Sequence, residues 1–193
     1  IFNPPFSHPE IDAYPYDPVR ARQLLAEAGY PDGFEINSLD TPLGKWIQDF
    51  ELAQTIESDL AEIGVTLRDG VRTFEWGNYR AKLLSHNLPG LFMQGSGGEF
   101  ELLTEAADLT ITSPSNFYQW QHDEYEMLWT QLQTELDLVR RTQIGYRMQE
   151  IVHEEAPWIF LHIQPDTYGV SDKIDWQPRP DEIIHLWNVS FSQ

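Results

Sequence analysis

The spacing of apolar side chains predicts a helix near the start of the chain, within residues 14–36. Asp17 is a suitable N-cap and Pro18 a suitable first helical residue, while Gly29 is a typical C-terminal stop. The apolar positions at helical spacing are Leu24, Leu25 and Ala28. A turn then leads into a strand that begins at Phe34, so we expect a capped helix followed by a sheet.

Farther along, strand-like and helix-like patterns alternate. Residues 34–40 predict one strand, and residues 65–73 predict a second that contains the turn signal Asp69-Gly70. Between them lies a long amphipathic helix that ends at Gly64. Its apolar face comprises Trp46, Ile47, Phe50, Ala53, Ile56, Leu60 and Ile63. The order of strand, helix and strand favours a sheet with crossover helices.

The remaining chain continues this alternation. Helices are expected at residues 75–84, 101–107, 124–136 and 138–155, and strands at 91–94, 158–163 and 182–191. The apolar run 158–163 is expected to be a buried strand, because it is short and Pro157 and Pro165 flank it. We therefore predict an α/β fold for residues 1–193, a mixed sheet flanked by helices in a single unit.

Charge and composition exclude several classes of partner. Thirty-one acidic residues against 12 Lys and Arg give a formal charge of −19, which repels nucleic acids and anionic membrane surfaces. The absence of cysteine excludes disulfides and thiol catalysis. No apolar run is long enough for a transmembrane helix, and any secretory leader is expected upstream of Ile1 or already removed.

A glycine-rich segment that follows the predicted strand 91–94 is one candidate binding edge. Gln94, Gly95 and Ser96 would let a ligand approach the backbone, because glycine has no side chain and the Gln94 amide both donates and accepts hydrogen bonds. Glu99 could add negative charge. A flexible surface turn explains the same residues equally well. A phosphate loop does not, because no Walker lysine is present and the surroundings are acidic.

Aromatic residues in an irregular loop are the second candidate. Asn116, Tyr118 and Trp120, together with Phe117, combine aromatic faces with polar groups, which suits sugar rings or apolar side chains. Trp76 and Tyr79 could join them. For each aromatic residue taken singly, packing within the protein's own core is the better expectation.

Metal binding and catalysis find little support. The six histidines lack metal-ligand spacing, and Ser96 does not lie in a GxSxG motif. The pairs Glu154-Glu155 and Glu99 with Glu101 are nominal glycosidase carboxylates, but nothing orients one as acid and the other as base. We predict no catalytic residue, no metal site and no cofactor. A noncatalytic protein-interaction module carries about the same weight as an enzyme.

Three separated segments resemble the C-terminal lobe of the family 5 extracellular solute-binding proteins, the peptide, opine, nickel and oligosaccharide receptors of ABC importers. They are YPYDPVRARQLLAEAGYPDGFEI, LAQTIESDLAEIGVTLRD, and MQEIVHEEAPWIFLHI with the downstream DKIDWQP. In peptide-binding members, a Gly-Trp segment and a following acid contact the ligand's amino terminus. In the corresponding stretch 91–101, Gln94 and Gly97 replace the Trp and the acid.

The resemblance implies one lobe of a periplasmic-binding-protein type II fold, with an N-terminal lobe absent from this chain. It implies an extracytoplasmic monomer, membrane-anchored through that absent portion, that closes on a peptide or similar solute and delivers it to ABC importer membrane subunits. An oligosaccharide is the alternative ligand, and a carboxylate-dependent glycoside hydrolase is a more remote alternative. The ligand-binding residues expected are Gln94, Gly95, Ser96, Glu99, Asn116, Tyr118 and Trp120.

Overall fold

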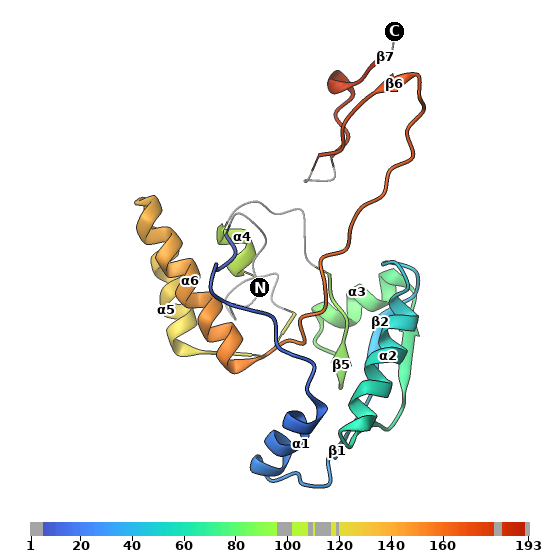
Figure 1. The fold of residues 1–193 in the computed structure, drawn as a ribbon, viewed down its shortest axis with the longest axis vertical. Coiled ribbons are helices and arrows are strands. Elements are labelled where there is room, and N and C mark those ends of the chain that lie inside the picture. The colour runs from blue at the N-terminus through green and yellow to red at the C-terminus, as the bar shows by residue number, and fades with distance from the viewer. Residues whose placement is uncertain are drawn as a thin grey trace. The chain divides into compact units, whose positions relative to one another are not determined.

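The computed structural model describes residues 6–95, 102–107, 110, 117–118, 120–179 and 183–191. Its internal contacts divide the chain into two compact units (Figure 1). The sheet unit comprises Asp12–Gly95 and Pro114–Gln119; the helical unit comprises Ile1–Ile11, Ser96–Ser113 and Trp120–Gln193. That both belong to a single lobe stays a prediction.

The predicted first helix is confirmed as α1 (Pro18–Glu27). The Asp17 carboxylate accepts a hydrogen bond from the Arg20 backbone N–H at 2.8 Å, as an N-cap should. Gly29 adopts a φ of +94°, the left-handed conformation in which glycine ends helices without steric cost.

Each of the first two predicted strands is divided in two. The segment 34–42 contains β1 (Phe34–Ile36) and β2 (Leu39–Pro42), and the segment 65–74 contains β3 (Val65–Leu67) and β4 (Val71–Phe74). β1 pairs with β3 and β2 pairs with β4, both in parallel. The Asp69-Gly70 turn signal therefore does not make a hairpin. Between the two pairs of strands, the three residues 68–70 lie opposite the two residues 37–38, and the one extra residue shifts the register as a β-bulge does.

β2 is the central strand of the larger sheet. It lies between β4 and β5 (Leu91–Phe92), and all three strands are parallel. α2 (Asp49–Glu62) covers one face, where Leu39, Ala53 and Met93 form a buried core. The helix begins later than predicted, so Trp46 and Ile47 precede it. These two residues lie in the loop that joins β2 to α2.

The other face of this sheet carries α3 (Trp76–Leu84), close to its predicted bounds. Glu75 caps it by accepting hydrogen bonds from the backbone N–H groups of Gly77 and Asn78. Alternation along β4 places Phe74 on the face opposite to Val71, and there the Phe74 ring lies near Tyr79 of α3. The parallel sheet is thus covered by helices on both faces, as its fold class requires.

The helical unit contains α4 (Leu102–Ala107), α5 (Asp123–Leu132) and α6 (Leu138–Glu155). The helix predicted at residues 138–155 is confirmed as α6, and its apolar residues Met148, Ile151 and Val152 are fully buried. α5 ends four residues earlier than predicted. No helix among the described residues is long and apolar enough to cross a membrane.

The prediction of a buried strand at residues 158–163 is wrong. These residues form no strand, and Ile163 is 75% exposed. An apolar run becomes a strand only when a neighbouring strand supplies its backbone hydrogen bonds, and the described residues supply none here. The predicted last strand is also shorter: it is reduced to the 3₁₀ turn Leu186–Asn188 and β7 (Ser190–Phe191), which pairs antiparallel with β6 (Ile174–Asp175).

Candidate functional site

The carboxyl ends of β2, β4 and β5 meet at one edge of the sheet, because the three strands are parallel and adjacent. Ligands of open α/β sheets bind outside this edge, where the loops that follow the strands converge. In this unit those loops are residues 43–48 after β2, Glu75 after β4, and residues 93–95 after β5. We call this edge the carboxyl edge.

A buried carboxylate fixes the loop that follows β2. Asp49, the first residue of α2, is 3% exposed and accepts three backbone hydrogen bonds. The donors are the N–H groups of Gly44 at 3.1 Å, Lys45 at 2.8 Å and Trp46 at 3.1 Å. The donors lie in the loop before α2, and the acceptor is in the first turn of the helix, where an acidic side chain is favourable. Asp49 therefore holds the loop in one conformation and positions Trp46.

Aromatic rings line the carboxyl edge. The Trp46 and Trp76 rings meet edge to face with centroids 6.1 Å apart, and Trp76 stacks on Tyr79 at 6.2 Å. Lys45 Nζ lies 5.1 Å from the centroid of Trp76, within cation–π range. Trp46 also packs on Gly95, where a Cβ atom would come within 2.6 Å of the indole Nε1. Any side chain at position 95 would therefore displace the indole.

Gln94 lies at the same edge and has an unused acceptor. Its Nε2 donates to the carbonyl oxygen of Gly95 at 3.1 Å, whereas its Oε1 is buried and has no hydrogen-bond partner among the described residues. A buried amide oxygen without a partner is unfavourable, so a donor supplied by a ligand would be stabilising there. This supports the choice of Gln94 and Gly95 as ligand-binding residues, which stays a prediction.

An ion pair lies in the sheet beneath this edge. Asp40 of β2 is fully buried, and its carboxylate accepts from Arg72 Nε and Nη2 of β4, both at 2.7 Å. The hydrogen bond to Asp40 raises the pKa of Arg72. The Tyr79 hydroxyl is within donating distance of the carbonyl oxygens of Asp40 and Met93, and burial raises its pKa, so it remains a neutral donor. These contacts hold the three strands in register.

The other predicted ligand residues are more scattered. Tyr118 stacks on Phe92 of β5, with ring centroids 5.5 Å apart. Trp120 belongs to the helical unit, where its ring lies 5.3 Å from that of Tyr125. A role for Tyr118 or Trp120 in binding stays a prediction. Ser96, Glu99 and Asn116 lie outside the described residues.

Sequence reasoning assigned Trp46 to the apolar face of a helix and did not single out Asp49. A signal was available, because Asp49 and Glu51 are close together and acidic residues are enriched in the first turn of a helix. Trp76 and Tyr79 were named only as possible additions to the aromatic group. Their proximity to Trp46 depends on parallel strand pairing, which a single sequence does not state.

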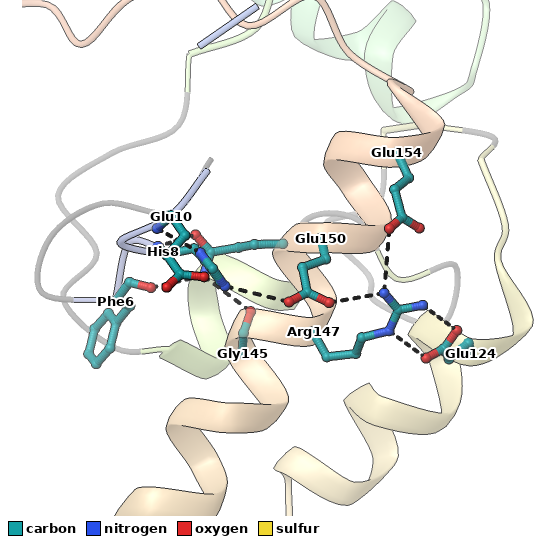
Figure 2. Close-up of polar contacts among 9 residues, drawn as sticks. Phe6, His8, Glu10, Glu124, Gly145, Arg147, Glu150 and Glu154 are labelled. Carbon is teal, nitrogen blue, oxygen red and sulfur yellow. Dashed lines mark hydrogen bonds and ion pairs between the residues drawn. The ribbon is translucent and has the colours of Figure 1, made fainter. Parts of the chain in front are cut away.

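The helical unit contains a second polar cluster, centred on Arg147 of α6 (Figure 2). Arg147 donates to both carboxylate oxygens of Glu124 at 2.7 and 3.0 Å, and its Nη1 contacts Glu150 and Glu154. Its hydrogen bond lowers the pKa of Glu124. Glu154, named above as a nominal catalytic acid, is thus part of a surface ion-pair network.

The same part of the helical unit binds the beginning of the chain to α6 (Figure 2). The buried Gln149 accepts from the His8 backbone N–H at 3.0 Å and donates to the carbonyl oxygens of Phe6 and Gly145. Among the described residues, no group of three or more His, Asp and Glu could hold a metal ion.

Comparison with known proteins gives the family. No protein-family model matches the chain. The heme-binding protein A of Haemophilus influenzae is 33% identical over 162 residues, which are 78% of this chain and 28% of that protein. The dipeptide-binding protein of Escherichia coli is 28% identical over 79% of this chain and 29% of its own length. The chain belongs to the family 5 solute-binding proteins. It spans less than a third of the length of these two family members.

Solved structures give the fold of this family 5 chain. A periplasmic oligopeptide-binding protein from Borrelia burgdorferi superimposes with a TM-score of 0.82 at 21% identity, over 97% of this chain and 38% of that one. The periplasmic binding protein DppA from Helicobacter pylori, solved with the peptide STSA, gives 0.67 at 24% identity, over 79% of this chain and 30% of its own. The expected periplasmic-binding-protein type II fold is confirmed.

Proposed function

We propose that the protein carrying this chain is the extracytoplasmic solute-binding component of an ABC importer and captures a peptide or similar small solute. The observation that carries the proposal is the carboxyl edge, where Trp46 packs against Trp76 and Gly95, and where the amide oxygen of neighbouring Gln94 has no hydrogen-bond partner among the described residues. Relatives named for binding dipeptides, di- and tripeptides and glutathione support a peptide as the ligand.

The mechanism proposed is closure of two lobes around the ligand. Contacts made to both lobes stabilise the closed state, and only this difference in affinity can drive closure. The ligand is released unchanged to the importer's membrane subunits, so the protein is not an enzyme. We further propose that it acts as a monomer and is anchored to the membrane. Ser96, Glu99, Asn116, Tyr118 and Trp120 stay proposed as ligand-binding residues.

A porphyrin is the second candidate ligand, since the relative at 33% identity is named for heme binding. Two features of the carboxyl edge favour it: flat indole rings that could stack on a macrocycle, and Lys45, whose charge could pair with a carboxylate. An oligosaccharide remains a third candidate, because aromatic rings also stack on sugars.

The test is a titration of the protein that carries this chain with a dipeptide mixture, glutathione, hemin and maltooligosaccharides, each followed by calorimetry. We expect saturable binding of a peptide, weakened at least tenfold by Gly95→Ala, because the added Cβ displaces Trp46. Gly169→Ala is the matched control, since nothing lies near its added Cβ. Binding that Gly95→Ala leaves unchanged would contradict the carboxyl edge as the site, and turnover of the ligand would contradict a receptor.

A further inference from the structure

A pocket of about 410 Å³ lies in the sheet unit beside β5, and neither Gln94 nor Gly95, which follow that strand, lines it. Its lining residues are Lys82, Leu83, His86, Leu88, Pro89, Gly90, Phe92 and Phe117. We call it the α3 pocket, because the last turn of α3 and the residues just after it form one wall. Its volume is within the range of small-molecule sites.

The charge of the α3 pocket is opposite to that of the chain. None of its lining residues is acidic, although the chain carries 31 acids against 12 Lys and Arg. Lys82 is half-buried and forms no ion pair with any described residue; its Nζ lies 5.2 Å from the Phe74 ring. Arg72 approaches the same ring at 5.6 Å, but its charge is balanced by Asp40. Lys82 therefore gives the pocket a positive charge within an acidic protein.

His86 contributes a second basic side chain and an unusual backbone. Its φ is +50°, a left-handed conformation that costs energy for a residue other than glycine. Its side chain makes no hydrogen bond or ion pair with the described residues. At the end of α3, the carbonyl oxygens of Ala81, Lys82 and Leu83 already accept hydrogen bonds from residues 85–87. These oxygens therefore do not compete with a bound anion for the donors of the pocket.

The remaining wall of the pocket is apolar and aromatic. The Phe92 ring stacks on the ring of Tyr118, and the angle between the two ring planes is 17°. Phe117 and Leu88 provide further apolar surface, and Gly90 lies so close to the Ser38 backbone that no side chain fits there. A flat apolar body could lie against these groups while its charged end reaches Lys82 and His86.

We propose that the α3 pocket is a second binding site, for a small aromatic anion that bears a carboxylate or phosphate. It is separate from the carboxyl edge and does not depend on the function proposed for that edge. Lys82 lies in the last turn of α3 and His86 lies just beyond its end, so the anion would be contacted by the end of α3 together with β5. Occupancy would also bury the exposed His86 side chain.

The experiment titrates the protein that carries this chain with phenyl phosphate at low ionic strength, with phenol as the neutral probe of the same shape. We expect saturable binding of one phenyl phosphate, weakened by 0.5 M salt, and much weaker binding of phenol. Lys82→Gln should reduce the affinity about tenfold, because it removes one charge-assisted hydrogen bond. His86→Gln should weaken binding less, since the imidazole is exposed.

Lys173→Gln, an exposed lysine of the helical unit, is the matched control for the loss of one positive charge. Phe117→Leu tests the aromatic wall without emptying it, and we expect it to weaken phenyl phosphate more than inorganic phosphate. The proposal is overturned if wild-type protein shows no saturable binding, or if Lys82→Gln and Lys173→Gln have the same effect. Displacement of phenyl phosphate by a saturating dipeptide mixture would also overturn it, since the two sites are proposed to be separate.

Discussion

Two arginine–carboxylate pairs of nearly the same geometry occur in the two units and differ in burial. In the sheet unit Arg72 forms an ion pair with Asp40, which is fully buried. In the helical unit Arg147 forms an ion pair with Glu124, whose side chain is 41% exposed. Both pairs have two hydrogen bonds of 2.7 to 3.0 Å. Geometry alone therefore does not distinguish them. What differs is the cost of leaving one partner alone, which depends on access to water.

The difference in burial corresponds to a difference in the structural role of the charged residues in the two units. In the sheet unit, buried Asp40 and Asp49 fix the strands and the loop that form the carboxyl edge. In the helical unit, Arg147 lies among Glu124, Glu150 and Glu154 at the surface, where water can replace any one contact. Buried carboxylates therefore support the candidate site, whereas in the helical unit Arg147 mainly reduces repulsion among exposed carboxylates.

The largest expected effect is that of Arg72→Met. It leaves Asp40 buried without its partner, and we expect the free energy of unfolding to fall by about 3 to 5 kcal/mol in urea denaturation. Arg68→Met is the matched control, because Arg68 pairs with Glu35 at 2.8 Å but both side chains are at least half exposed. That variant should lose about 1 kcal/mol or less.

A double variant tests whether burial is the cause. Asp40→Leu with Arg72→Met removes both charges, and we expect it to recover most of the lost stability, because no buried charge is left unpaired. Equal losses for Arg72→Met and Arg68→Met, or no recovery in the double variant, would contradict the comparison.

The second prediction extends the comparison to a buried carboxylate that has only backbone donors. Asp49→Ala leaves the N–H groups of Gly44, Lys45 and Trp46 without their acceptor, and we expect a loss of about 2 kcal/mol. Glu51→Ala, at an exposed acid in the same first turn, controls for the helix dipole. The indole resonance of Trp46 should broaden or shift in Asp49→Ala alone. An unchanged indole resonance would show that Asp49 does not position Trp46.

The sequence predicted most helices but not the details that create the carboxyl edge. α1, α3 and the buried stripe of α6 follow from local caps and apolar spacing, which a single segment carries in itself. The division of residues 34–42 into β1 and β2, and the exposure of residues 158–163, depend on which strand lies alongside. Periodicity does not state partners, so these could not be predicted.

The candidate site was predictable to a similar extent. Gln94 and Gly95 could be predicted as candidates, because glycine after a strand is a local signal for close backbone approach. The pairing of Asp40 with Arg72 could not, because it joins residues 32 positions apart through the register of β2 and β4. Trp46 was assigned to the wrong element, because the apolar spacing of α2 extends to Trp46 and Ile47, which precede the helix.

The smallest expected effect is that of Glu124→Gln in the helical unit, and its pH dependence gives the sharpest comparison with the sheet unit. Arg147 holds the pKa of Glu124 below its ordinary value, so the pair contributes stability above the unfolded-state pKa of about 4.3 and loses it as the pH falls through the lower folded-state pKa. The difference in urea midpoint between wild type and Glu124→Gln should therefore be small, constant between pH 6 and about pH 8, and smaller still at about pH 3.5. Added salt should reduce it further, because both side chains are partly exposed. The comparison would be contradicted if the difference in urea midpoint grew on acidification, or if it exceeded the difference between wild type and Asp49→Ala. Either result would show that exposure does not determine how much these interactions contribute to stability.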